Sequence, residues 1–166
     1  RREVANELLR NEQRWLPRLA PLLPLEVPAP LHVGEPMFGY PWTFSVLAWQ
    51  PGEAADLDYP DPAEAWVLAR FLRALHQATH AEGAAAPVNG VRGVPLVQRT
   101  AATLARLERL RRIPGVELPF ARIFRLWEEA LAAPVSEHPV WLQGDMHARN
   151  VLVREGKLVS IIDWGD

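Results

Sequence analysis

The sequence predicts an α+β fold in which helices predominate and short strands pair in antiparallel hairpins. Three observations support this prediction: apolar residues at helical spacing near the N-terminus and in three later segments, two short apolar runs bounded by proline and glycine, and an alternating hairpin pattern at the C-terminus. The sequence contains no internal repeat or low-complexity tract, so we expect a globular fold and not a repeat array.

Length and composition are those of an ordinary globular chain. Its 166 residues can bury a substantial core, and 49% of them are apolar and 23% charged. The formal charge of −2 argues against a nucleic-acid partner held by a broad basic surface, and the sequence shows no signal-peptide pattern and no apolar run of about eighteen residues. The absence of cysteine excludes disulfides and thiolate metal sites. We expect a cytoplasmic protein without nucleic-acid or membrane partners; composition leaves the oligomeric state open.

The first predicted element is a helix over residues 3–16. Apolar residues recur at i, i+4 spacing along one face, and Pro17 breaks or kinks the helix. Glu12 places a carboxylate on the same stripe, and a buried carboxylate requires a cationic partner. The pattern alone favours a plainer interpretation, in which Glu12 borders the stripe and meets water or surface charge. Glu7 is the alternative carboxylate on this helix.

An extended connector and two strands follow the helix. Repeated prolines make residues 17–30 an extended segment that cannot be helical. Short apolar runs at 31–33 and 43–49 predict strands, because glycines and prolines separate them and Pro51-Gly52 ends the second. These two strands are expected to pair antiparallel.

Three helices are predicted in the middle of the chain. The first begins with the capping signature Asp61-Pro62-Ala63-Glu64 and runs to about His80. The others span about 95–112 and 119–133, and the last has an apolar and aromatic stripe typical of a core-facing helix. His76 and His80 have the i, i+4 spacing of a metal pair. Without a third ligand nearby in the sequence, we interpret them as a solvated helix end.

Residues 143–166 are the most informative stretch. Asp145 lies in a tight turn, Asn150 follows five residues later and opens an alternating strand, and Asp163 ends the next strand. Glu155-Gly156 between the strands is a hairpin signal, so the chain folds back and the three side chains converge. Phosphoryl transfer uses such a set: a carboxylate takes the hydroxyl proton, while an amide and a second carboxylate hold Mg²⁺. Taken singly, each residue has a plainer interpretation as a turn or strand-capping residue.

The segments GDMHARN and IIDWGD resemble the aminoglycoside phosphotransferase and choline kinase-like family of the protein kinase-like fold. The catalytic loop of that family reads H-G-D-x-x-x-x-N, and its second metal motif is an apolar-apolar-D-x-G segment. The resemblance implies that Asp145 is the catalytic base, Asn150 a metal ligand and Asp163 the main Mg²⁺ ligand. It also implies a partial two-lobed fold, with the remainder of the N-lobe at residues 1–50 and a mostly helical C-lobe at 51–166.

The same resemblance assigns roles to the segment after the second strand and to the first helix. The backbone of Ala48, Trp49 and Gln50 would form the hinge that hydrogen-bonds the nucleotide base, whereas the plainer interpretation packs Trp49 in the core. Glu12 would pair with a lysine on an N-lobe strand. Lys157, the only lysine in the sequence, lies in the C-terminal hairpin and cannot fill that role. We therefore expect an internal segment, inactive by itself, that lacks the first N-lobe strands and the last C-terminal helices.

Two positions depart from the family pattern. Gln143 stands where the family usually has a histidine that braces the loop, which puts the rigidity of the loop in question. Ala148-Arg149 replaces a Pro-Gly pair, so that a cation lies close to the phosphates or the substrate, or points to solvent.

The leading functional interpretation is a phosphotransferase. It would move the γ-phosphate of ATP or GTP, with Mg²⁺, to a hydroxyl of a small molecule, either an aminoglycoside-like antibiotic or a metabolite. One alternative is a metal-dependent phosphoesterase, since Gly-Asp-Met-His resembles part of a dinuclear metal motif, although the further histidine motifs of such sites are absent. The other is a kinase-like binding module without turnover, which the missing strand lysine leaves open.

Overall fold

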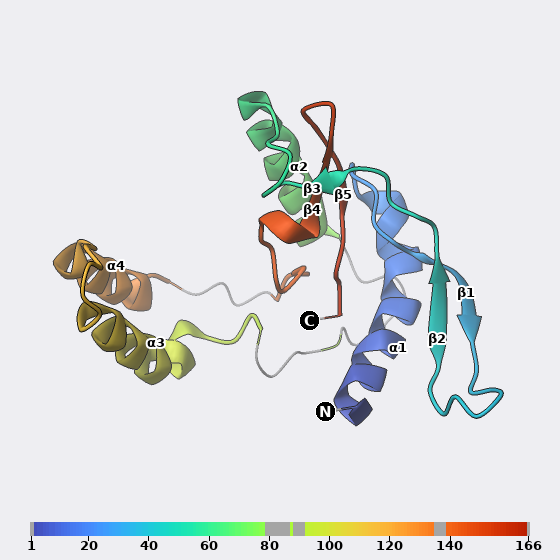
Figure 1. The fold of residues 1–166 in the computed structure, drawn as a ribbon, viewed down its shortest axis with the longest axis horizontal. Helices are drawn as coiled ribbons and strands as arrows, with labels where there is room; N and C mark the ends of the chain where they lie inside the picture. Colours follow the sequence, from blue (N-terminus) through green and yellow to red (C-terminus); the bar gives the residue numbers. More distant parts are fainter. Residues whose placement is uncertain (1, 79–86, 88–91, 135–138, 166) are drawn as a thin grey trace. The chain divides into compact units, whose positions relative to one another are not determined.

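The computed structural model describes residues 2–78, 87, 92–134 and 139–165 (Figure 1). These residues form the predicted α+β fold, with four α-helices and two small antiparallel sheets of two and three strands. The chain divides into two compact units, one made of Arg1–Val88 and Val140–Asp166 and the other of Asn89–Pro139. No helix in the described ranges is long and apolar enough to cross a membrane. The division into lobes at residue 50 stays a prediction.

The first unit begins with helix α1 (Arg2–Leu19) and the 3-10 turn η1 (Ala20–Leu22). The expected break at Pro17 is wrong, and so is the extended connector over residues 17–22, because the helix continues to Leu19 and η1 follows it. A proline this close to the helix end removes only one backbone hydrogen bond. Leu16 and Leu19 are buried on either side of it and anchor the last turn in the core.

Strands β1 (Pro30–Gly34) and β2 (Phe44–Leu47) pair antiparallel, which confirms the first predicted hairpin. The amide of Gln13 on α1 donates a hydrogen bond to Ser45 Oγ at 3.0 Å. This contact attaches α1 to the two-stranded sheet. The position of α1 relative to the segment after β2 is therefore fixed within the unit.

The three-stranded sheet has the order β3-β4-β5, with β3 (Glu53–Ala54), β4 (Val151–Arg154) and β5 (Lys157–Ile161) all antiparallel. The predicted turn joins β4 and β5, and Glu155 and Gly156 both have positive φ, 53° and 74°. Two consecutive residues of that conformation match the twist of a tight hairpin. The two-residue strand β3 has no sequence pattern of its own and was not predicted.

Helix α2 (Ala65–Gln77) begins one turn later than predicted, after the 3-10 turn η2 (Pro62–Glu64). Glu64 occupies the N-cap position of α2, but its side chain makes no capping hydrogen bond. Only 7% of its surface is exposed, and it accepts a hydrogen bond from the backbone N–H of Leu158 at 3.0 Å. The contact fixes the start of α2 against the beginning of β5. His80, at the predicted end of this helix, lies outside the described residues.

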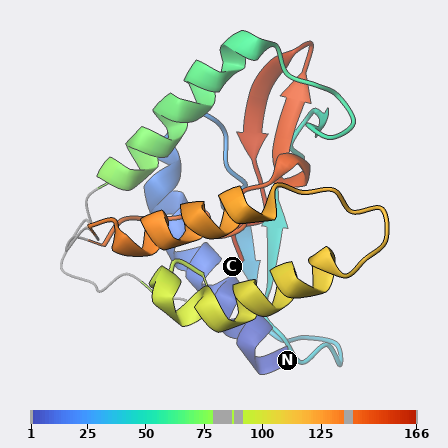
Figure 2. The same cartoon turned by 90° about the vertical axis from the view of Figure 1, so that its left-hand side faces the viewer.

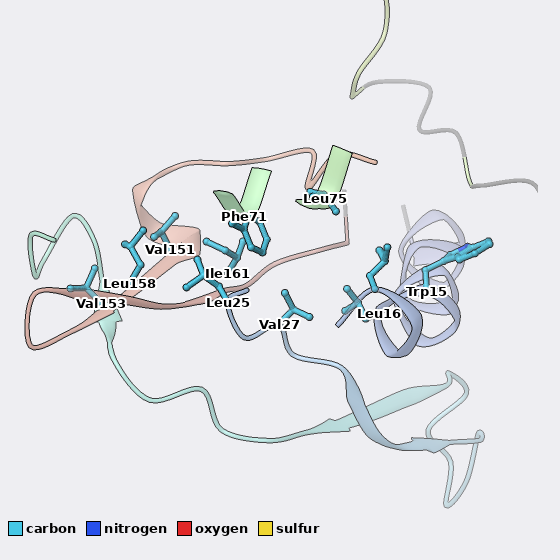
Figure 3. Close-up of a cluster of buried hydrophobic side chains, with 11 residues drawn as sticks. Trp15, Leu16, Leu25, Val27, Phe71, Leu75, Val151, Val153, Leu158 and Ile161 are labelled. Carbon is cyan, nitrogen blue, oxygen red and sulfur yellow. The ribbon is translucent and has the colours of Figure 1, made fainter. Parts of the chain in front are cut away.

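A continuous hydrophobic core joins these elements (Figure 3). It draws on α1, the segment after it, α2 and the β4–β5 hairpin, and its buried members are Trp15, Leu16, Leu19, Leu25, Val27, Phe71, Leu75, Val151, Val153, Leu158 and Ile161. Phe71 and Leu75 are fully buried, as the predicted stripe of α2 requires. Truncating a residue such as Phe71 to alanine costs about 3–5 kcal/mol in a core of this kind. The core therefore fixes the positions of β4 and β5, the strands next to the polar residues that are predicted to act in catalysis and metal binding.

The second unit contains α3 (Leu96–Arg111) and α4 (Phe120–Ala132), close to the two predicted helices. They lie side by side and run in opposite directions (Figure 2). No residue of α4 is fully buried. Most of its aromatic stripe is half-buried, so the expected core face is only partly covered within this unit.

Candidate active site

The candidate site lies in the first unit, where the loop before β4 meets the residues after β5. Gly144 has a φ of 90°, which lets the chain turn sharply before Asp145. The loop closes in the 3-10 turn η4 (Ala148–Asn150), whose preceding residue His147 accepts a hydrogen bond at Nδ1 from the backbone N–H of Arg149, 3.1 Å away. Trp141, just before the loop, packs against Trp15 of α1 with ring centroids 5.0 Å apart.

The side chain of Asp145 is partly exposed and lies beside His147. Its Oδ2 is 3.6 Å from Nε2 of the imidazole. Because Nδ1 of that ring accepts a hydrogen bond, the neutral ring carries its proton on Nε2, the nitrogen that faces the carboxylate. A partly exposed carboxylate with a neighbouring N–H donor can accept a proton from a bound hydroxyl group.

Asn150 is buried, with 5% of its surface exposed. Its side-chain Nδ2 donates to the backbone oxygen of Asp145 at 3.1 Å, and its own backbone oxygen accepts from the N–H of Ile162 at 2.9 Å. The side-chain nitrogen of Asn150 thus donates a hydrogen bond within the site. The side-chain oxygen is therefore the atom of this amide group that can bind a cation.

Asp163 lies two residues beyond the end of β5, and its φ of 59° turns the chain away from the direction of the strand. Aspartate tolerates this left-handed conformation better than most residues. Trp164 next to it donates from Nε1 to Ile161 O at 2.9 Å and meets Phe71 edge to face, with centroids 6.2 Å apart. The exposed carboxylate of Asp163 therefore lies on a segment that packs against α2 through the contact of Trp164 with Phe71.

Gln143 connects the two halves of the site. Its Nε2 donates to the backbone oxygens of Ile162 at 3.0 Å and Asp163 at 2.5 Å, and its Oε1 accepts from the backbone N–H of Asp145 at 2.9 Å. The departure from the usual histidine therefore does not leave the loop unsupported. The sequence alone indicated only that Gln143 puts the rigidity of the loop in question.

Glu12 reaches the same region from α1. A Cβ atom on Gly165 would lie 2.7 Å from Glu12 Oε1, so the Glu12 side chain would have to shift if residue 165 were larger than glycine. Burial, and to a lesser extent the neighbouring charge of Asp163, raises the pKa of Glu12 to about 6. The carboxylate is half-buried beside another carboxylate, and the predicted pairing with a lysine stays a prediction. Two neighbouring negative groups favour the binding of a cation.

The predicted hinge residues Ala48, Trp49 and Gln50 follow β2 immediately. Trp49 is 88% exposed, so the alternative in which it packs in the core is wrong. The side chain of Gln50 lies against the three-stranded sheet, where its Oε1 accepts a hydrogen bond from Ser160 Oγ of β5 at 2.8 Å. Base binding by this segment stays a prediction, and it would rest on backbone groups.

The chemistry of the donor atoms fits Mg²⁺. Asn150 offers an amide oxygen and Asp163 a carboxylate, which are the hard oxygen ligands that Mg²⁺ prefers. Within the described ranges, no group of three or more His, Cys, Asp and Glu side chains could hold a metal by itself. A site with only two protein ligands suits a Mg²⁺ ion whose remaining ligands are phosphate oxygens and water.

Arg149 and Asp56 form a contact that no sequence pattern indicated. Arg149 Nε lies 3.0 Å from Asp56 Oδ2, and the neighbouring Ala55 N–H donates to Ala148 O at 3.0 Å and Val151 O at 2.9 Å. The segment after β3 thus supports the outer side of the loop that carries Asp145 and Asn150. Arg149 points to this carboxylate, which resolves the question of its direction.

Comparisons with known proteins identify the family and the fold of the chain. The model of the phosphotransferase enzyme family matches residues 1–166. The chain is similar in structure to the GDP complex of wild-type aminoglycoside 2'-phosphotransferase-IIIa, with 22% identity and a TM-score of 0.60 over 98% of this chain and 56% of that one. No curated protein matches.

Two further solved structures show the same fold. Macrolide 2'-phosphotransferase MphH from Brachybacterium faecium, an apoenzyme, is 21% identical with a TM-score of 0.56 over 96% of this chain and 54% of that one. The streptomycin–ATP–APH(2")-IIa ternary complex is 16% identical with a TM-score of 0.54 over 98% and 55%. The chain spans little more than half the length of these proteins.

Proposed function

The chain belongs to the phosphotransferase enzyme family, and we propose that the complete gene product transfers the γ-phosphate of a nucleoside triphosphate to a hydroxyl group of a small molecule. One observation carries the proposal: Gln143 and Asn150 connect Asp145, Asn150 and Asp163 through hydrogen bonds within a single cluster. These are the three residues for which the sequence predicts catalysis and metal binding.

In the proposed reaction Asp145 handles the proton. The acceptor oxygen forms a bond to the γ-phosphorus while the bond from that phosphorus to the bridging oxygen breaks, and the hydroxyl proton passes to the Asp145 carboxylate. The nucleoside diphosphate leaves with the electron pair of the broken bond. His147 Nε2, 3.6 Å from the carboxylate, helps to orient it toward the acceptor.

Positioning is the main contribution of the remaining residues. Asn150 Oδ1 and the Asp163 carboxylate would hold Mg²⁺, which when bound supplies positive charge against the phosphate oxygens. The rigid loop of Asp145 keeps the base and these donors in one arrangement. The backbone at Ala48, Trp49 and Gln50 would receive the base of ATP or GTP, and Glu12 would orient a phosphate-binding lysine.

The acceptor belongs to the class of hydroxyl-bearing small molecules, either aminoglycoside-like antibiotics or metabolites. Several similar structures are named as enzymes that act on aminoglycosides or macrolides. We propose a cytoplasmic protein that has neither a nucleic-acid nor a membrane partner.

A binding module without turnover is the second candidate, and the position of Lys157 favours it. Its Nζ lies 3.3 Å from both Asp61 and Glu64, which directly precede α2. These two carboxylates therefore hold the only lysine of the sequence near the start of that helix. A phosphoesterase with two metal ions is not supported by the described residues, which hold no suitable cluster of His, Cys, Asp and Glu.

The test is phosphate transfer by the complete gene product, measured with γ-labelled ATP and GTP against a panel of aminoglycosides, macrolides, sugars and amino alcohols. Label transferred to an acceptor in the presence of Mg²⁺, and lost in the Asp145→Ala variant, supports the phosphotransferase. Mg²⁺-dependent nucleotide binding with no transfer to any acceptor supports the binding module.

A further inference from the structure

The amide of Gln143 is bonded to backbone groups of both segments that carry the proposed chemistry. Its two N–H bonds meet the oxygens of Ile162 and Asp163, and its oxygen meets the N–H of Asp145. Only 3% of the residue is exposed, so little water competes for these hydrogen bonds. The residues joined in this way lie up to 20 positions apart in the sequence.

Both segments need support from outside their own strands. Asp163 lies beyond the last paired residue of β5, Ile161, and its φ of 59° is costly for a residue with a Cβ atom. Asp145 follows a glycine in a left-handed conformation, Gly144, and precedes β4 by several residues. Neither residue is part of a strand, and the side-chain hydrogen bonds of Gln143 and Asn150 add to the single backbone bond from Ile162 N–H to Asn150 O in holding the two segments together.

A carboxamide is the side chain that satisfies this set of backbone groups. It has two N–H donors on one nitrogen and an acceptor oxygen beside it, whereas a neutral imidazole has one donor and one acceptor on separate ring nitrogens. A histidine at position 143 would leave one of the two carbonyl groups unpaired. A leucine of similar size would leave all three backbone groups without this partner.

We propose that Gln143 is a positioning residue that couples Asp145 to Asp163, so that the proton acceptor and the metal-binding carboxylate keep one relative arrangement. The proposal rests on the proposed function, because it concerns the same site. Gln143 acts through the backbone of the residues on either side of the site. Its removal should therefore disturb two properties together: the placement of the base and the affinity for Mg²⁺-nucleotide.

The first experiment measures amide hydrogen exchange by NMR in the 166-residue chain without ligands. Gln143→Leu should speed exchange at Asp145 about tenfold or more, and should also change the amide signals of residues 163–165. The control is Thr100→Val, which removes a side-chain hydrogen bond to Leu96 O within α3, in the other compact unit. It should leave both sets of signals unchanged. Gln143→His, with one donor and one acceptor, serves as the milder variant if the leucine variant does not fold.

The second experiment is a double-mutant cycle in the complete gene product. Gln143→Leu should lower kcat and Mg²⁺-nucleotide affinity together, each by about tenfold. Asp145→Asn should then cost less in the Gln143→Leu background than in the wild type, because the base is already displaced. Melting temperatures of all variants identify any loss that is due to unfolding.

The outcomes separate the coupling from the function. Additive effects in the cycle, or exchange changes confined to Asp145 with residues 163–165 unchanged, would overturn the coupling. If the wild type neither binds Mg²⁺-nucleotide nor transfers phosphate, the proposed function fails, and the exchange measurement alone decides whether Gln143 joins the two segments.

Discussion

Asn150 donates a hydrogen bond from its side-chain nitrogen to the backbone oxygen of Asp145, 3.1 Å away. This bond sets the direction of a buried amide group and leaves its oxygen as the cation-binding atom. The proposed base and one proposed metal ligand are therefore placed relative to each other by the loop itself, before any nucleotide is present. Such preorganisation is what a reaction driven by positioning and charge requires.

Asp145→Asn should separate proton transfer from nucleotide binding. The substitution keeps the size of the side chain and the backbone bonds to Gln143 and Asn150, but removes the proton acceptor. We expect kcat to fall by about 10²-fold or more in the complete gene product, with Mg²⁺-nucleotide affinity near that of the wild type. Steady-state kinetics and nucleotide titration check this; a near-normal kcat would remove Asp145 from the role of base.

Glu12→Gln should change the pH dependence of stability. Burial and the charge of Asp163 raise the pKa of Glu12 from 4.5 to about 6, so the folded chain binds a proton between these pH values that the unfolded chain has released. The free energy of unfolding therefore falls as pH rises from 4.5 to 6, by about 1 kcal/mol once solvent screening is allowed for. The variant lacks this loss and should be more stable than the wild type at pH 7.

Urea denaturation without Mg²⁺ at pH 4.5 and pH 7 measures the difference. The two proteins should differ less at pH 4.5 than at pH 7, because at pH 4.5 folded Glu12 is almost fully protonated and unfolded Glu12 is still about half protonated. Glu7→Gln on the same helix is the control, because Glu7 is exposed. A variant that is no more stable than the wild type at pH 7 would contradict the assigned environment of Glu12.

Glu64→Ala should destabilise the first unit by about 1–3 kcal/mol. The substitution leaves the N–H of Leu158 without its acceptor inside the protein, and the loss of a buried hydrogen-bond partner has that scale. Glu64→Gln keeps an acceptor oxygen and should cost less. Asp61→Asn alters only an exposed contact with Lys157 and should change the unfolding midpoint least. Equal midpoints for the two Glu64 variants would show that the hydrogen bond to Leu158 does not matter.

The sequence predicted the parts of the fold that depend on local patterns. The β4–β5 hairpin follows from alternation and the turn at Glu155-Gly156, and all four helices follow from apolar periodicity. The contacts of Glu64 and Gln143 were missed because they join residues 94 and 20 positions apart. A sequence does not show which distant backbone group a side chain contacts. The capping signature at Glu64 and the departure from the family pattern at Gln143 therefore gave no indication of these hydrogen bonds.

In the candidate site, too, some features could be predicted from the sequence and others could not. The residue types at 145, 150 and 163 and their spacing indicated the chemistry, since few functions use that set together. The left-handed φ of Asp163 and the approach of Glu12 to Gly165 could not be read from the pattern. Both depend on how α1 and the core place the end of β5.

The 166-residue chain expressed alone should transfer no phosphate above the background of its Asp145→Ala variant. The reason is the position of Lys157, which is paired with Asp61 and Glu64 and leaves no lysine to bind the phosphates. The assay is label transfer from γ-labelled ATP or GTP to the acceptor panel. Turnover by the wild-type chain above that background would show that another residue binds the phosphates.

The most direct test of the site is a titration of ATP and GTP against the complete gene product, with and without Mg²⁺, in the wild type and in Asp163→Asn. The variant loses the carboxylate that would bind the metal but keeps the size of the side chain. Asp61→Asn is the matched control and should bind as the wild type does. We predict that Mg²⁺ raises wild-type affinity for the nucleotide and that Asp163→Asn lowers the Mg²⁺-dependent affinity by about tenfold or more. Equal Mg²⁺-dependent affinities in the wild type and Asp163→Asn would contradict the assignment of Asp163 and, with it, the phosphotransferase site.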